Sequence, residues 1–421
     1  MDEESQSGDM PLLPGEDITF EDKSPEPIAN DEELNSRYVK GDVRIVTESA
    51  RYSLAGILSM LKESVKTDEK GGSESRYKLD PEYQRRHRWS IQRKSRLIES
   101  FLMNVPVPPV FLYERDLARY EVMDGRQRLT ALSEFYADKF ELSGLQYWTE
   151  LHGRTYSTLP SKVRDGIDRR YISSVILLKE TASNEEQAAQ LKKMVFERLN
   201  SGGVALSHQE TRNAVYDGRL NQLCLRLSTN EEFRSMWGIP TVPLTEIEDE
   251  EESEEREETK IGRKMYEKME DVELVLRFFA YRQIDRSPKG LNKISALLDR
   301  FLIQGNKFSA EIISAYEQMF DSTISFLDQL LGNQAFCRLG KTSRPTKIVY
   351  DPIMYIASRY SQGECRDLLL SNKETLERDL NQMYSENDAL FAGRRTNSSD
   401  VRCRNTIVAD VFEKALRRVA Q

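Results

Sequence analysis

The sequence has few of the residues from which disulfide frameworks and metal centres are built. Its 421 residues include four cysteines and three histidines. The cysteines contain no Cys-x-x-Cys pair, and no two of the histidines would share one helical face. These absences argue against a disulfide-stabilised fold, a zinc site and histidine-dependent nuclease chemistry. The cysteine usage instead fits a reducing cytoplasm, where we expect the protein to be located.

Long apolar runs are also missing. No stretch approaches the roughly 18 residues that a membrane-spanning helix needs. The first residues, Met1–Glu4, lack the basic and apolar regions of a secretory signal. We therefore expect no membrane partner. With 38% hydrophobic and 31% charged residues, the chain has the composition of a soluble globular protein, and it is long enough for two domains.

Negative charge is concentrated in two segments. Residues 1–33 carry a net charge of −11 and residues 246–258 carry −9, so the rest of the chain carries +11 although the total is −9. Segments of this composition are usually disordered and solvated, which is what we expect here. The alternative is that they mimic a polyanion and occupy a basic groove until nucleic acid displaces them. The basic remainder points to an anionic partner without identifying it.

Hydrophobic periodicity predicts a mixed α/β region followed by a helical one. Helices are expected at 53–66, 91–103, 127–137 and 184–199, and strands at 110–113, 119–123 and 174–178. From about residue 213 onward, apolar residues recur mostly at helical spacing. The fold class is therefore α+β. We expect a disordered acidic tail over 1–35, an α/β domain over 36–235, an acidic loop over 236–262 and an α-helical domain over 263–421.

The most informative stretch is the Asp-Gly turn, by which we mean residues Asp124–Arg128, between a predicted strand and a predicted helix. Such a junction offers backbone N–H groups and the positive end of a helix dipole to an anion. Gly125 permits a positive φ, and Asp124 could cap the helix, hold Mg²⁺ or orient a water. Arg126 and Arg128 are two residues apart and point in different directions, so we expect one to face a ligand and the other to pack.

Two other segments carry candidate binding residues. The first, Tyr83–Arg96, is basic, has no acidic residue and is interleaved with aromatic rings, a combination that suits phosphate contacts and base stacking. Its alternative is a solvated basic helix with Trp89 in the core. The second, Phe196–Gly203, ends a helix with Asn200 and two glycines. This is ordinary helix-ending chemistry, although an amide there can also read a nucleobase or a phosphate.

Together these motifs resemble the N-terminal domain family of GmrSD-type restriction endonucleases, whose fold is similar to that of ParB and sulfiredoxin. The family's Asp-Gly-Gln-Gln-Arg signature matches the Asp-Gly turn at four of five positions, and its Phe-x-x-x-Asn motif matches Phe196 to Asn200. The segment from Tyr83 to Trp89 and the stretch Gln209–Ala214 also resemble family motifs. The resemblance covers roughly residues 50–235.

The resemblance implies binding, and in some relatives hydrolysis, of nucleoside triphosphates, with Mg²⁺ as the accompanying cofactor. The candidate catalytic residues are Asp124, Gln127 and Arg128, of which Asp124 is also the candidate metal ligand. The candidate nucleotide-binding residues are Arg85, Arg88, Trp89, Gly125, Arg126, Phe196 and Asn200. The candidate DNA-binding residues are Arg93, Lys94 and Arg96.

The chain departs from the family pattern in two respects. The first glutamine of the signature is Arg126 here, which adds positive charge but removes an amide that could position water, so binding is better supported than turnover. No histidine follows His208, so the chain lacks the His-Asn-His nuclease motif often fused to relatives, and DNA cleavage would need a separate nuclease subunit.

Three readings of function follow. The leading one is a nucleotide-binding, and conceivably nucleotide-hydrolysing, protein of a restriction or phage-defence system. The first alternative is a non-enzymatic, ParB-like DNA-binding module that contacts the DNA backbone through the basic segments 83–96 and 394–404. The second alternative is a degenerate scaffold that pairs with a partner nuclease.

Overall fold

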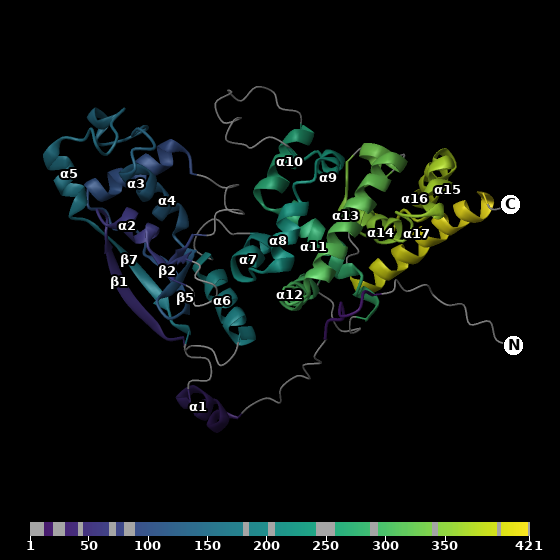
Figure 1. The fold of residues 1–421 in the computed structure, drawn as a ribbon, viewed down its shortest axis with the longest axis horizontal. Helices are drawn as coiled ribbons and strands as arrows, with labels where there is room; N and C mark the ends of the chain where they lie inside the picture. The colour runs from purple at the N-terminus through teal and green to yellow at the C-terminus, as the bar shows by residue number, and fades with distance from the viewer. Residues whose placement is uncertain are drawn as a thin grey trace. The chain divides into compact units, whose positions relative to one another are not determined.

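The computed structural model describes residues 12–19, 30–40, 45–66, 73–79, 89–179, 185–200, 207–240, 257–286, 294–338, 344–393 and 397–419. The chain divides into two compact units (Figure 1). The α/β unit is Pro25–Ala205, and the helical unit combines Met1–Ser24 with Leu206–Gln421. The α/β unit is thus inserted between two parts of the helical unit. The mixed α/β region followed by a helical region confirms the expected fold class.

A five-stranded mixed sheet forms the centre of the α/β unit, in the order β1-β7-β5-β6-β4. Neighbouring strands β1 and β7 pair antiparallel, β7 and β5 parallel, β5 and β6 antiparallel, and β6 and β4 parallel. The strands are β1 (Thr47–Ser53), β4 (Tyr77–Lys78), β5 (Val110–Asp116), β6 (Arg119–Asp124) and β7 (Tyr171–Leu177). Strands β2 (Ser64–Lys66) and β3 (Ser73–Ser75) form a separate antiparallel pair.

Helices cover both faces of this sheet. The helices of the unit are α1 (Asp31–Lys40), α2 (Ile57–Lys62), α3 (Ile91–Leu102), α4 (Arg126–Tyr136), α5 (Ser161–Asp168) and α6 (Glu185–Asn200), with a short 3-10 helix η2 (Thr149–Leu151). Val122 of β6 belongs to the apolar core that α2, α3 and α4 share with the sheet. Side chains alternate along a strand, so Glu121 points to the opposite face, where it meets α6.

The expected helix 91–103 is present as α3 and begins as the sequence indicates. The hydroxyl of Ser90 accepts a hydrogen bond from the backbone N–H of Arg93 and caps the helix. Leu97, Ile98 and Phe101 are buried, whereas Ile91 in the first turn is exposed. The expected helix over 53–66 is shorter, because α2 occupies only Ile57–Lys62 and strand β2 follows it.

The helical unit is built around two buried helices, α11 (Glu270–Tyr281) and α14 (Lys347–Ala357), which contact each other. Phe279 of α11 stacks on Tyr316 of α13 with ring centroids 4.4 Å apart. The other helices are α7 (His208–Val215), α8 (Arg219–Leu227), α9 (Glu231–Trp237), α10 (Glu257–Glu267), α12 (Ile294–Gly305), α13 (Ala310–Leu331), α15 (Glu364–Ser371), α16 (Lys373–Glu386) and α17 (Ser398–Val419), with 3-10 turns η5 (Ile284–Arg286) and η6 (Gly332–Gln334).

The acidic segment is partly helical at its ends. Of the loop expected over 236–262, the start belongs to α9 and the end to α10, while residues 241–256 lie outside the described part of the chain. Gly262 of α10 lies against the backbone of Gly238, so closely that a side chain at 262 would collide with the Gly238 carbonyl. The described ends of this segment are therefore packed helix, which corrects the expectation of an exposed loop there.

The N-terminal tail also differs from expectation. Residues 12–19, which we call the N-terminal strap, pack on the helical unit, and α1 already begins at Asp31. The carboxylate of Glu16 is fully buried and accepts hydrogen bonds from Nε and Nη2 of Arg282 at 2.6 and 2.8 Å. Gln283 Nε2 donates to the backbone carbonyl of Glu16, and Gln304 exchanges two hydrogen bonds with the backbone of Thr19. Composition suggests solvation here, but one buried ion pair orders the strap.

We predict that Glu16→Ala destabilises the protein by about 3–5 kcal/mol, because it leaves the buried Arg282 guanidinium without its carboxylate. Asp17→Ala is the matched control: its ion pair with Arg286 is exposed, so the expected change is within about 0.5 kcal/mol. Urea denaturation followed by far-UV circular dichroism measures both. Equal unfolding free energies for the two variants would show that the strap is not bound in solution.

Candidate functional site

The Asp-Gly turn has the backbone geometry that the sequence predicts. Strand β6 ends at Asp124, Gly125 adopts a left-handed conformation with φ +89°, and α4 begins at Arg126. Gly125 lies so close to β5 that a Cβ there would be 2.5 Å from Cγ1 of Val110 and 2.9 Å from Nη2 of Arg128. Both the positive φ and the close approach require glycine. The turn is thereby fixed with the first turn of α4 directly behind it.

The two arginines of the turn have separate surroundings, as their spacing predicts. Arg126 is buried, and its Nη2 donates to the backbone carbonyl of Val122 at 3.0 Å. Arg128 reaches back over the turn instead. Its Nη2 donates to Oδ2 of Asp124 at 2.8 Å and to the backbone carbonyl of Pro109 at 3.1 Å. Arg126 is therefore the arginine that packs, and Arg128 is the one held beside the Asp124 carboxylate.

Gln127 brings a second predicted segment to the turn. Its Oε1 accepts a hydrogen bond from the backbone N–H of Trp89 at 3.4 Å, so Trp89 lies beside the start of α4. The Trp89 ring is half-buried against the apolar core, and the guanidinium of Arg93 lies over it at 4.6 Å. Arg85 and Arg88 lie outside the described residues. The structure thus brings Trp89 together with the turn.

The third predicted segment is anchored by an ion pair that the sequence analysis missed. Lys192 of α6 is buried, and its ammonium group donates to both carboxylate oxygens of Glu121 at 2.6 and 2.7 Å. Phe196, one turn further along α6, is buried, and Asn200 is the last residue of that helix. The signal was present: Lys192 occupies an otherwise apolar stripe at helical spacing before Phe196.

The basic residues of α3 differ in how available their charges are. Lys94 is paired with Glu134 of α4 at 2.8 Å and lies over the Phe140 ring. Arg93 and Arg96 are exposed. The C-terminal basic segment is less suited to DNA: Arg404 is buried and donates to the carbonyl of Leu390, and Arg402 donates to the carbonyl of Ile284. These two arginines help hold the helical unit together, which counts against the DNA-binding alternative at Arg402 and Arg404, while residues 394–396 lie outside the described part of the chain.

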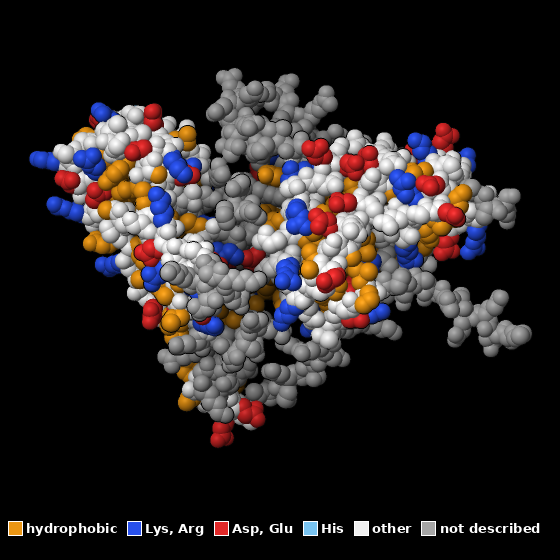
Figure 2. Space-filling view, viewed as in Figure 1, with side chains coloured by type: hydrophobic (Ala, Val, Ile, Leu, Met, Phe, Trp, Pro, Cys, Tyr) orange, Lys and Arg blue, Asp and Glu red, His pale blue; other side chains and the backbone are white. Residues whose placement is uncertain are grey.

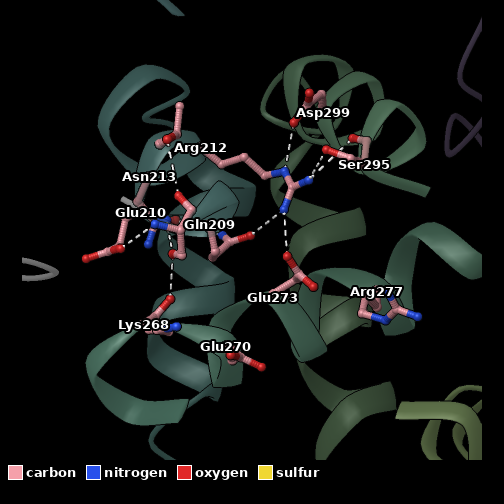
Figure 3. Close-up of polar contacts among 12 residues, drawn as sticks. Gln209, Glu210, Arg212, Asn213, Lys268, Glu270, Glu273, Arg277, Ser295 and Asp299 are labelled. Carbon is pink, nitrogen blue, oxygen red and sulfur yellow. Dashed lines mark hydrogen bonds and ion pairs between the residues drawn. The ribbon is translucent and has the colours of Figure 1, made fainter. Parts of the chain in front are cut away.

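The stretch Gln209–Ala214 has a structural role in the helical unit. Ser207 and Glu210 form a capping box at the start of α7, as their spacing indicates. Arg212 is almost wholly buried among carboxylates and hydroxyls (Figure 3). Its guanidinium donates to Asp299, to Glu273, to Gln209 and to the side chain and carbonyl of Ser295, at 2.7–3.4 Å.

Glu273 completes this network from α11. Burial alone would raise the pKa of its carboxyl, but the positive charges of Lys347, Arg212 and Arg277 lower it below the ordinary glutamate value. The carboxylate therefore stays charged in the interior, where it neutralises Arg212. This stretch ties α7 to α11 and α12 and leaves no donor of Arg212 for a ligand.

Among the described residues, no group of three or more His, Cys, Asp or Glu side chains is arranged to hold a metal ion. Asp124 would be a single carboxylate ligand. Mg²⁺ is commonly bound by one or two carboxylates together with substrate phosphates and water, so the residue type fits the expected Mg²⁺–nucleotide complex. No helix in the described ranges is long and apolar enough to cross a membrane.

The fold and the turn define a class of protein: a small mixed α/β domain in which an interior strand passes through a left-handed glycine into a helix, followed by a helical region. Residues 65–216 match the family described as GmrSD restriction endonuclease, N-terminal domain. The match runs from β2 to α7 and includes the Asp-Gly turn. It indicates a restriction or phage-defence type of system. Neither the curated proteins nor the solved structures gave a match.

We predict that Gly125→Ala destabilises the α/β unit by roughly 2–4 kcal/mol, because the alanine must adopt a left-handed backbone and its methyl group overlaps Val110. Gly166→Ala is the control. It lies in α5 with open space around an added Cβ, so we expect no loss or a gain of up to about 1 kcal/mol. Urea denaturation compares the two variants. A Gly125→Ala variant as stable as the Gly166→Ala variant would contradict the geometry of the turn.

Proposed function

We propose that the Asp-Gly turn binds the phosphates of a nucleoside triphosphate, and that the protein acts through this nucleotide in a restriction or phage-defence system. The observation that carries the proposal is the position of Arg128. Its guanidinium is held over a left-handed glycine at the start of α4, where backbone N–H groups and the helix dipole also favour an anion.

The pairing of Arg128 with Asp124 supplies a reason for coupling phosphate to metal. The two side chains neutralise each other in an ion pair of 2.8 Å. A phosphate group competes for the guanidinium, because an arginine–phosphate pair is a strong charge-assisted contact. Arg128 would then turn to the phosphate, and Asp124 would become available to Mg²⁺ or to a water. Mg²⁺ would supply charge neutralisation of the phosphate oxygens.

The remaining candidate residues have roles consistent with this arrangement. Gln127 begins α4 and is bonded to Trp89, so it lies where an amide could orient water or donate to a phosphate oxygen. Arg85 and Arg88 belong to the segment between Leu79 and Trp89, and we propose that one of them closes over the phosphates. Phe196 is buried on α6, so its ring is packed within the unit. The side chain of Asn200, the candidate contact to the base, the ribose or the metal, lies outside the described residues.

Binding is better supported than hydrolysis. Arg126 occupies the position of the first signature glutamine, and it packs against β6 rather than reaching the turn. The turn therefore has one amide side chain, that of Gln127, to position an attacking water. The basic side chains favour retention of the triphosphate through their charge. These side chains at the turn fit a protein that binds nucleotide as a signal and hydrolyses it slowly.

We predict that Arg128→Ala weakens nucleoside triphosphate binding by about 10- to 100-fold, because charge-assisted hydrogen bonds to phosphate are lost. Asp124→Asn should leave metal-free triphosphate binding unchanged or tighter, since it releases Arg128 and removes a negative charge. The same variant should lose any Mg²⁺-dependent phosphate release. Arg169→Ala, at an exposed arginine after α5, is the matched control and should bind like wild type.

Isothermal titration with each of the four nucleoside triphosphates, with and without Mg²⁺ and DNA, measures binding, and phosphate release measures turnover. Far-UV circular dichroism checks that each variant is folded. Absence of both binding and phosphate release in the wild-type protein would refute the proposal. If Arg128→Ala lowered only DNA affinity, the DNA-binding alternative would replace it.

A further inference from the structure

A second feature of the α/β unit is a loop held rigidly against α3. We call residues 143–151 the aromatic loop. The carboxylate of Glu99, on α3, accepts hydrogen bonds from three successive backbone N–H groups, those of Gln146, Tyr147 and Trp148, at 2.7–3.1 Å. Ser95, one turn earlier, accepts from the backbone N–H of Ser143 at 2.9 Å. The loop is therefore held on α3 at residue 143 and at residues 146–148.

Glu99 is charged in this position. Burial alone would raise the pKa of its carboxyl, but the N–H groups of Trp148, Tyr147 and Gln146 and the nearby charge of Arg96 lower the pKa below the ordinary glutamate value. Three donors on one carboxylate are the arrangement that holds such a group ionised. The backbone at Tyr147 and Trp148 is thus ordered by a buried anion, and its ordering does not depend on the two aromatic rings.

The rings themselves are left on the surface. Tyr147 is 73% exposed and Trp148 is 39% exposed. Both line an open pocket of about 450 Å³, whose other lining residues are Glu150, Leu151, Arg154, Pro160 and Val163. Two large rings on an ordered backbone lose little conformational freedom on binding a flat ligand, because their positions are already set.

One basic and one acidic side chain line this pocket, Arg154 and Glu150. Arg96 is not a lining residue, but it lies close enough to Glu99, which holds the backbone of Tyr147 and Trp148, to act on that carboxyl. Arg154 and Arg96 are both exposed, as is Arg93 in the first turn of α3. Figure 2 shows hydrophobic side chains next to Lys and Arg side chains on this unit, in the region that Figure 1 labels α3 and α5. Exposed rings beside cations suit a ligand that is flat and anionic.

We propose that this pocket binds an unstacked nucleobase of single-stranded nucleic acid, with Tyr147 and Trp148 as stacking partners and with Arg154 and Arg96 near the phosphate backbone. Every base has a flat face, so stacking tolerates sequence, while the arginines supply the salt-dependent contacts to phosphates. The proposal does not rest on the nucleotide site at the Asp-Gly turn. It also gives the exposed arginines of α3 an accompanying base-binding surface.

We predict that the full-length protein binds a fluorescein-labelled strand of about 15 thymidines more tightly than the corresponding duplex. Tyr147→Ala and Trp148→Ala should each weaken single-strand binding by roughly 10-fold, and Arg154→Gln should reduce its salt dependence. Fluorescence anisotropy at several salt concentrations measures these changes. Binding should also quench the fluorescence of Trp148, which the Trp148→Ala variant identifies among the three tryptophans.

Tyr171→Ala is the matched control, since Tyr171 is a 58% exposed tyrosine on the same unit that does not line the pocket. It should bind the single strand like wild type. Equal loss in Tyr171→Ala and Tyr147→Ala, or no binding of the strand by the wild-type protein, would overturn the proposal. If the Trp148→Ala variant bound single-stranded DNA like wild type but lost binding to a protein partner, the proposal would likewise be overturned. Nucleoside triphosphate binding should be unchanged in all four variants, which separates this test from that of the turn.

We predict that Glu99→Gln releases the aromatic loop without removing a ring. A neutral amide is a weaker acceptor for three N–H groups than a carboxylate, so the amides of residues 146–148 should exchange with deuterium faster. The pKa of Glu99 is lowered in the folded protein. Wild-type protection should therefore be complete above the ordinary glutamate pKa and be lost as the pH falls through the lowered pKa of Glu99. Single-strand affinity should fall with the exchange protection. Unchanged exchange in Glu99→Gln would contradict the role given to this carboxylate.

Discussion

Three buried arginines that are each paired with carboxylates organise the helical unit. Arg212, Arg277 and Arg282 are all buried, and each is paired with acidic side chains from distant parts of the chain. An unpaired guanidinium in the interior costs several kcal/mol, so each pair fixes which segments must come together. Arg277 selects Asp351 and joins α11 to α14, and Arg212 joins α7 to α11 and α12. Arg282 selects Glu16, 266 residues away in sequence.

The same constraint decides which motif residues remain for a ligand. Several charged residues that are typical of a binding motif are used within the fold instead: Arg126 on the Val122 carbonyl, Lys94 on Glu134 and Arg212 in its network. Asp124 and Arg128 also form an ion pair, but the Asp124 carboxylate is more exposed than Glu134 or Glu273, and under the proposed function this pair opens to a phosphate and a cation. A charged residue is thus available to a ligand only if its ion pair can open without leaving a buried charge unpaired.

The elements around the turn could be predicted because their signals are local. The Asp-Gly junction, the Ser90 cap and the Ser207–Glu210 capping box each lie within a few residues of sequence. Strand β1 was missed because Thr47–Ser53 is polar and largely exposed, so it shows no apolar alternation. The N-terminal strap was missed for a different reason: its order depends on Arg282, and no local property of Glu16 reveals that partner. Spacing shows that Arg126 and Arg128 diverge, but only the packing of β6 shows which one turns inward.

Helix α3 connects the two proposed binding sites of the α/β unit. Trp89, just before its start, is bonded to Gln127 at the turn, Lys94 pairs with Glu134 of α4, and Glu99 holds the aromatic loop. Rigid connection alone does not make two sites interdependent, because a ligand shifts an equilibrium only by its difference in affinity for two arrangements. The bond that could supply such a difference is the one from Trp89 to Gln127: it is the longest of these contacts at 3.4 Å, and Gln127 is also the amide proposed to contact phosphate. A nucleotide that draws Gln127 away from Trp89 would loosen the start of α3. Because α3 also carries Glu99, this loosening would be transmitted to the aromatic loop.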